Sequence, residues 1–140
     1  MSATSGKGNY LSKALIELAL GTTSFTPAVT LYCALYTATP SATGGGTEVT
    51  GGSYARVAVT NNVTNFPASS LVTGITTLLN GTVIDFGNAT ADWGAIGWAA
   101  LWDASSSGNL YYWGPLAITR TVLNGDGFKI PVGGATFTEI

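Results

Sequence analysis

Carboxylates are the main side chains of this sequence that could carry acid–base chemistry, because the 140 residues include no histidine. A glycosidase, for example, needs two carboxyl groups that face each other across a groove. Asp92 and Asp103 flank one predicted strand, so they would lie about 33 Å apart along it and could not pair by themselves. The D-x-D-x-D pattern of a calcium loop is also missing. We therefore expect no catalytic, metal-binding or cofactor-binding residues and no enzymatic activity. The seven carboxylates are Glu17, Glu48, Asp85, Asp92, Asp103, Asp126 and Glu139.

The candidate nucleophiles lack the partners that would activate them. Cys33 is the single cysteine and lies in the apolar run VTLYCALYTA. Without a histidine it cannot form a Cys/His pair, so we expect a buried, inert thiol. No serine lies in a G-x-S-x-G or S-x-x-K motif, which are the local signatures of an activated serine.

The glycine cluster GGGTEVTGGSYAR, residues 44–56, raises the question of a phosphate-binding loop. A Walker loop places G-x-x-x-x-G-K-[ST] between a strand and a helix, whereas these glycines precede a predicted strand and no lysine follows them. The dinucleotide fingerprint G-x-G-x-x-G is absent as well. We interpret the segment as a backbone-rich loop between two core strands, shaped to lie against a neighbouring protein.

Aromatic side chains crowd the third quarter of the chain, and three interpretations of them stay open. Trp98 and Trp102 share a strand face with Ile96 and Ala100, which favours burial in the core. Tryptophan and tyrosine are also enriched in protein interfaces. A sugar-stacking platform is the third interpretation. The residues concerned are Trp93, Trp98, Trp102, Tyr111, Tyr112 and Trp113.

The elements that would position these residues are one helix and a series of short strands. The spacing of Leu11, Ala14, Leu15 and Leu18 predicts a helix over NYLSKALIELALG, with Asn9 as N-cap and Gly21 just past its end. After it the hydrophobic period shortens to that of strands. Asn80-Gly81, Asn124-Gly125 and SSSGN indicate tight turns, and Pro131 indicates an edge strand or a bulge. The predicted strands cover 29–38, 53–61, 82–86, 95–104, 109–114, 116–123, 127–132 and 135–140.

This pattern predicts an all-β fold: a jelly-roll-like antiparallel β-sandwich or a barrel, with one short N-terminal helix. We expect a flexible N-terminal arm over residues 1–8 and a single domain over 9–140. The longest predicted loop covers 39–53, and 62–79 is a second irregular region.

Charge is sparse, since only 9% of residues are charged, against about 25% in an average protein, and the net charge is −2. Nucleic-acid binding relies on a concentrated basic surface, which five scattered cations do not provide. No run approaches the ~20 apolar residues that span a membrane. We expect a soluble protein made in the cytoplasm, whose low surface charge favours contact with other proteins.

Two stretches, LYTATPSATGGGTEVTGGSYARVAV and TADWGAIGWAALWDASSSGNLYYWGPL, resemble a family of small tailed-phage virion proteins. Members of this family are frequently labelled tail-fibre-like. The chain is also similar, in size and all-β character, to the capsid cement protein of a short-tailed Bordetella phage. The resemblance weakens over residues 62–79.

The resemblance implies a jelly-roll sandwich that binds the outer surface of the major capsid protein lattice as a homodimer. Our first hypothesis is therefore a homodimeric cement or decoration protein on the outside of the virion capsid. The second is a tail-fibre or adsorption component that binds a host glycan or protein, and the third is a free carbohydrate-binding module. The expected capsid or subunit contacts are Ser5, Lys7, Glu48, Tyr54, Arg56, Trp93, Tyr111 and Trp113. We expect Arg56 and Glu48 to be the polar residues that anchor the chain to its partner. The alternative is that both lie at the solvated edge of the loop.

Overall fold

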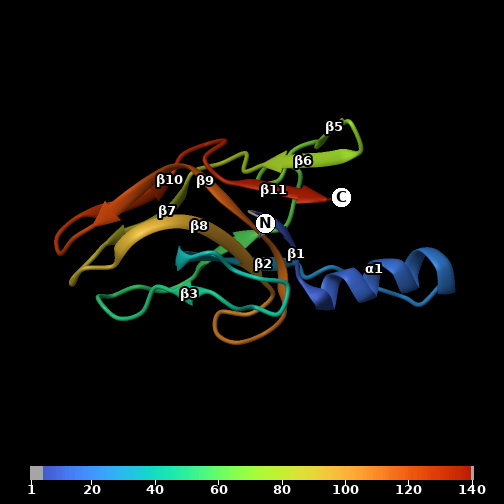
Figure 1. Cartoon of the computed structure of the whole chain (residues 1–140), viewed down its shortest axis with the longest axis horizontal. Helices are drawn as coiled ribbons and strands as arrows, with labels where there is room; N and C mark the ends of the chain where they lie inside the picture. The colour runs from blue at the N-terminus through green and yellow to red at the C-terminus, as the bar shows by residue number, and fades with distance from the viewer. Residues whose placement is uncertain (1–4, 140) are drawn as a thin grey trace.

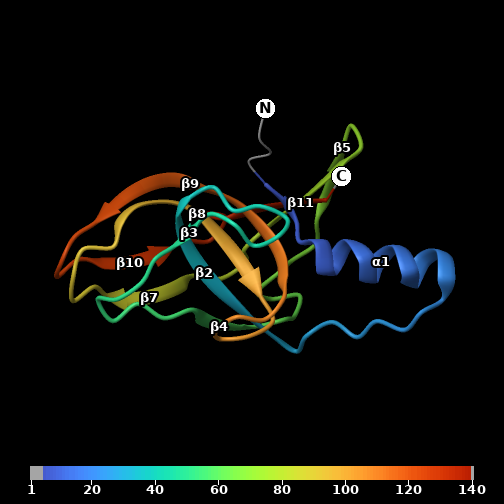
Figure 2. The ribbon, with the colours of Figure 1, turned by 60° about the horizontal axis from the view of Figure 1, so that its bottom comes forward.

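A six-stranded antiparallel sheet curls around one side of the core, and two smaller antiparallel sheets face it (Figures 1 and 2). The computed structural model describes residues 5–139. The large sheet has the order β1-β9-β8-β2-β3, with β4 also paired to β2. Its strands are β1 (Gly6–Lys7), β2 (Thr30–Ala38), β3 (Thr47–Glu48), β4 (Val57–Thr60), β8 (Gly94–Trp102) and β9 (Leu110–Val122). The predicted antiparallel sandwich is confirmed.

The strands of the two smaller sheets all lie within residues 70–139. One pairs β7 (Ile84–Asn88) with β10 (Gly127–Ile130), and the other has the order β11-β6-β5. Its strands are β5 (Ser70–Val72), β6 (Ile75–Leu79) and β11 (Thr136–Glu139). A bulge interrupts β10 between Gly127 and Lys129, and among the strands of residues 5–139 β10 pairs only with β7, so Pro131 follows an edge strand as predicted.

The main core fills the space between the large sheet and the smaller sheets. Leu35 from β2, Ile96 from β8 and Ile130 from β10 are almost completely buried there. Cys33 lies in the same core with no exposed surface, and this burial raises its pKa to about 12. The expected burial of the thiol is therefore confirmed.

A second, smaller cluster occupies the outer face of β2, β8 and β9. It contains Tyr36, Leu110 and Trp113, with Trp98 and Trp102 packed against it. Ile96 lies in the main core and not on this outer face. The pairing of β8 with β9 shifts register between Ile96 and Trp98, which interrupts the alternation of side chains between the two faces of the strand. The prediction that Ile96 and Trp98 lie on one face is wrong, since a bulge breaks the two-residue alternation of a strand.

Helix α1 (Asn9–Gly21) projects sideways from the sandwich and touches it mainly at its first turns (Figures 1 and 2). Its N-cap is Gly8 and its C-cap is Thr22 with φ 53°, so both ends differ from the predicted caps by one residue. Lys13 and Glu17, four residues apart on this helix, form an ion pair at 2.5 Å. No helix in residues 5–139 is long and apolar enough to cross a membrane.

Three segments differ from the sequence-based expectations. Residues 62–79 include the β5–β6 hairpin, closed by Thr73 and Gly74, which both have positive φ. The two strands predicted at 109–114 and 116–123 are one strand, β9, which continues through Pro115.

The third segment is the predicted flexible arm over residues 1–8. Gly6 and Lys7 pair with Trp113 and Tyr112 of β9, although residues 1–4 lie outside the described residues. Glycine permits this approach, because a Cβ at position 6 would lie 2.8 Å from the Trp113 ring.

Candidate functional site

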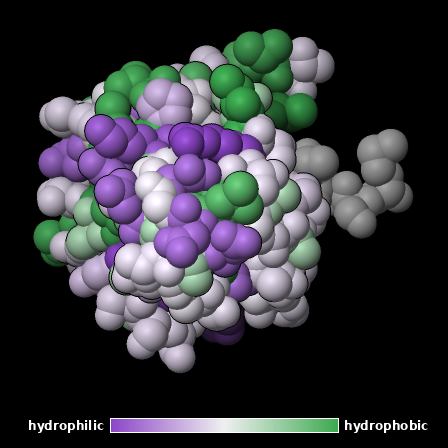
Figure 3. All heavy atoms as spheres, turned by 90° about the vertical axis from the view of Figure 1, so that its left-hand side faces the viewer, coloured by the Kyte–Doolittle hydropathy of each residue, from purple (hydrophilic) through white to green (hydrophobic). Residues whose placement is uncertain are grey.

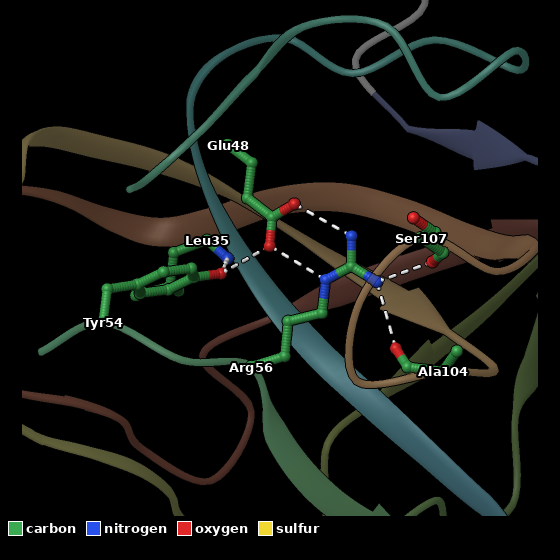
Figure 4. Close-up of polar contacts among 6 residues, drawn as sticks. All are labelled: Leu35, Glu48, Tyr54, Arg56, Ala104 and Ser107. Carbon is green, nitrogen blue, oxygen red and sulfur yellow. Dashed lines mark hydrogen bonds and ion pairs between the residues drawn. The ribbon is translucent and has the colours of Figure 1, made fainter. Parts of the chain in front are cut away.

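Arg56 and Glu48 form a two-point ion pair beneath the glycine-rich loop (Figure 4). Arg56 Nε donates to Glu48 Oε1 and Arg56 Nη2 donates to Oε2, each at 2.9 Å. Glu48 belongs to β3, and Arg56 directly precedes β4, so the pair ties the two ends of the intervening loop together. Planar bidentate pairs of this kind are stronger than single charged hydrogen bonds and fix the orientation of both groups.

The remaining donor of Arg56 holds a second loop, the β8–β9 connection. Nη1 donates to the carbonyl oxygens of Ala104 and Ser107 at 3.0 and 2.9 Å (Figure 4). The guanidinium carbon also lies 4.4 Å from the centre of the Trp102 ring, in cation–π contact. Burial acts to lower the pKa of Arg56, but the hydrogen bonds and charge of Glu48 outweigh it and raise that pKa. The Arg56 side chain is only 7% exposed, so its hydrogen bonds go to groups of the same chain and leave little for a partner.

Tyr54 extends this cluster into the core. Its hydroxyl donates to Glu48 Oε1 and accepts the Leu35 backbone N–H, both at 2.9 Å (Figure 4). Its ring stacks on Phe86 and meets Trp93 edge-on, with ring centres 6.2 and 5.6 Å apart. Burial raises the pKa of Tyr54 well above its ordinary value; the Leu35 N–H opposes this rise and Glu48 adds to it.

The glycines place the loop backbone directly against the sheet. The Gly52 carbonyl accepts Trp93 Nε1–H at 3.0 Å and the Thr90 N–H at 2.9 Å. Gly52 has φ 59°, and a Cβ there would lie 2.9 Å from Trp93 Nε1. The segment is a backbone-rich loop, as the sequence predicts. The surface that it lies against in this structure is the chain's own sheet.

The eight predicted contact residues fall into separate places, and most have partners within the chain. Glu48, Tyr54, Arg56 and Trp93 belong to the cluster just described. Ser5 and Lys7 bind Thr138 and Glu139 of β11 through side-chain contacts.

Tyr111 and Trp113 are buried on opposite faces of β9. The Tyr111 hydroxyl accepts the Ala28 N–H at 3.0 Å. These buried rings offer little surface to a partner, and their predicted role as contacts remains a prediction.

Four aspartates accept backbone N–H groups: Asp92, Asp103 and Asp126 lie in loops, and Asp85 lies in β7. The acceptors are Asp85 for Gly87 N–H, Asp92 for Asn124 N–H, Asp103 for Asn109 N–H and Asp126 for Leu123 N–H. Within residues 5–139, no three His, Cys, Asp or Glu side chains gather in a way that could hold a metal ion. The arrangement can fix backbone conformation, and the polar groups of the cluster are already bonded to one another.

Three loops join at the end of the sandwich opposite α1 (Figure 1), and we call them the loop end: residues 49–53, 88–93 and 123–126. Ser53 and Thr90 share a hydroxyl hydrogen bond at 2.8 Å, and Asp92 accepts the Asn124 N–H at 2.8 Å. Ala89 and Gly125 are joined through the backbone at 2.8 Å. Figure 3 shows hydrophilic groups gathered on this face among many groups of intermediate hydropathy, with a few hydrophobic groups at the edges and one near the centre.

Sequence reasoning missed two features. Asn80 is a buried amide that bonds three backbone groups, and its Asn-Gly turn signal hid this packing role. The other is an apolar hollow of about 410 Å³ at the base of α1, lined by Leu11, Leu15, Phe25 and Phe137 among others. The apolar stripe of α1 was the available signal for this hollow, but its spacing predicts only the helix and not the surface that the helix covers.

A family model described as Podophage GP4 fiber I protein gp80 matches residues 6–138, which run from β1 to β11. A comparison with curated proteins finds no match. The expected resemblance to tailed-phage virion proteins is confirmed at this level, and the word fiber agrees better with the second hypothesis than with capsid cement. The chain belongs to the Podophage GP4 fiber I protein gp80 family.

Proposed function

We propose that this chain is a structural subunit of a podophage tail fibre that takes part in adsorption to the host surface. The observation that supports this function is the family match, because it extends over residues 6–138 and includes α1, both layers and the loop end. A match of this extent concerns the whole fold instead of one shared module.

The loop end is the surface we assign to the host. Its three loops are hydrogen-bonded to one another, so they form one pre-ordered surface and lose little conformational freedom on binding. Its hydrophilic character suits a polar partner such as a host glycan or a hydrophilic protein surface (Figure 3). Many copies on one virion would multiply a weak single contact.

Competition with phage adsorption tests this assignment. Purified wild-type protein should reduce adsorption of the phage to its host, whereas Thr50→Arg and Ala91→Arg, both exposed at the loop end, should compete less well. Thr60→Arg is the matched control, because Thr60 is also exposed but belongs to β4. Equal competition by all four proteins would contradict a role for the loop end.

Copy number and position in the virion separate a fibre from a capsid cement. A fibre subunit should be present in few copies and be labelled by antibodies at the tail. Hundreds of copies distributed over the head would support the capsid-cement hypothesis and contradict the proposal.

A further inference from the structure

We propose that the end of the molecule formed by α1 and the β5–β6 hairpin is a self-association surface, in which α1 of one copy packs into the apolar hollow of a second copy. The inference goes beyond the role in adsorption, since it concerns the opposite end of the molecule and holds whatever the loop end binds. The first observation is the position of these two elements, which project from the same side of the sandwich in both ribbon views (Figures 1 and 2).

Helix α1 is apolar on more of its circumference than its own chain covers. Leu11 is buried against the sandwich, but Ile16 is 58% exposed and Leu20 is 83% exposed. Ile16 and Leu20 are four residues apart and therefore share one face, and Leu20 lies on the side of the helix opposite Leu11. Lys13 and Glu17 lie beside these two side chains on the outer side of the helix, and the apolar face itself is left uncovered, so it offers surface to a second copy.

The same end holds a hollow that complements such a face. It measures about 410 Å³ and lies between the base of α1 and the strands β6 and β11. Its floor is apolar, with Phe25, Leu31 and Phe137 among the lining residues, and Ser69 and Thr76 are polar residues of its lining. Each chain carries both the exposed apolar face of α1 and the hollow. Two copies related by a twofold axis could therefore fill each other's hollow.

The exposed apolar area at this end is large enough for one side of a stable dimer. Beyond α1, the β5–β6 hairpin exposes Leu71 (70%) and Val72 (68%), together with Ile75. If a fully exposed apolar side chain offers on the order of 100 Å², this end exposes about 400 Å² when Tyr10 (44%) and Leu18 (43%) of α1 are counted as well. A standard interface buries about 800 Å² per partner, of which a little over half is apolar. The two values agree.

The charges near this surface favour a second copy as the occupant. Lys13 and Glu17 of α1 already pair with each other, and Glu139 at the hollow is bound by Lys7 and by the Tyr112 hydroxyl at 2.8 Å. Association would therefore bury no unpaired charge from these residues, which removes a desolvation cost that would otherwise oppose an interface between two copies.

Sedimentation velocity with charged variants tests the surface. Wild-type protein should form dimers or a larger closed oligomer at micromolar concentration, and the double variant Ile16→Glu, Leu20→Glu should be monomeric, with association weakened at least about 100-fold. Ser69→Arg, at the hollow, should have the same effect without touching α1. Ile118→Glu is the matched control, because Ile118 is 77% exposed on β9, away from both elements. Circular dichroism and thermal melting of each variant confirm that it folds.

A cross-linking experiment separates helix-in-hollow packing from contact between two helices. Mixing Leu20→Cys with Ser69→Cys and oxidising gently should give a disulfide-linked heterodimer, since the native Cys33 is buried and does not compete. A wild-type protein that stays monomeric, a double variant that associates like wild type, or cross-links only between two Leu20→Cys chains would each overturn the proposal. A hollow that serves a small apolar ligand would give the first of these results.

Discussion

Arg56 and Glu48 meet through two parallel hydrogen bonds of 2.9 Å, Nε to Oε1 and Nη2 to Oε2, although they lie eight positions apart in the chain. The pair closes the loop that contains Gly51 and Gly52, and Arg56 carries the contact on to the β8–β9 connection through Ala104 and Ser107. One side chain therefore sets the position of two loops. The glycines could adopt many conformations, and this pair selects one of them.

Arg56→Lys should lower the free energy of unfolding by about 1–3 kcal/mol, although the charge is kept. A lysine ammonium cannot reproduce the planar fork that reaches both Glu48 oxygens and two carbonyls at once. Arg120→Lys is the matched control, because Arg120 is exposed on β9. Urea denaturation of the three proteins measures the difference, and equal midpoints for both variants would show that the fork contributes nothing.

Tyr54→Phe should destabilise the protein by about 1–3 kcal/mol, because it leaves the Leu35 N–H without its acceptor and removes one donor from Glu48. The ring contacts with Phe86 and Trp93 would remain. Tyr32→Phe, on the same strand as Leu35, is the control, since the Tyr32 hydroxyl makes no hydrogen bond to residues 5–139. A loss of stability that is equal in the two variants would assign the effect to the general removal of a hydroxyl.

The fold was largely predictable because it follows from local patterns. Alternation and β-forming residues located β2, β4 and β8, and the SSSGN turn located the connection that Asp103 and Asn109 close. The β5–β6 hairpin was missed, since its turn residues are Thr73 and Gly74 instead of the Asn-Gly or Asp-Gly pair that signals such turns.

The cluster around Arg56 was only partly predictable, for a physical reason. Arg56 and Glu48 stood out as two of few charges, but their contact depends on β3 and β4 both pairing with β2, which spacing alone does not show. The same holds for Trp93 and Trp113: composition marked them, and only the register of the sheet decides that they are buried.

Asn80→Asp should destabilise the protein by about 3–5 kcal/mol at neutral pH. The Asn80 amide nitrogen donates to the carbonyls of Thr82 and Pro131 at 2.9 and 2.8 Å, and its oxygen accepts the Ala135 N–H at 2.9 Å. A buried carboxylate would face two carbonyl oxygens, which favour its neutral form and raise its pKa. The loss should therefore diminish as the pH falls through that raised pKa.

The control for this prediction is Asn62→Asp. Asn62 is exposed, and its side-chain oxygen only accepts, from the Thr64 and Asn65 N–H groups, so a carboxylate can replace it. Thermal melts at neutral and acidic pH compare the two variants, and a melting temperature of the Asn80 variant that falls further in acid would contradict the argument.

Alkaline pH should destabilise the protein in part through Cys33. Burial raises the pKa of this thiol from 9.0 to about 12, so the folded state holds the proton after the unfolded state has released it. Stability from this group is complete below the unfolded pKa and is lost as the pH rises through the window between the two values. From about pH 8 to about pH 10.5, the wild type should lose about 2 kcal/mol more than Cys33→Ala.

The comparison uses the change with pH in each protein, so the small cavity left by alanine cancels, and the burial-raised pKa of Tyr36 affects both proteins alike. Parallel pH profiles would mean that the thiol ionises in the folded protein, and its rapid alkylation by iodoacetamide under native conditions would then identify an opening of the core at β2.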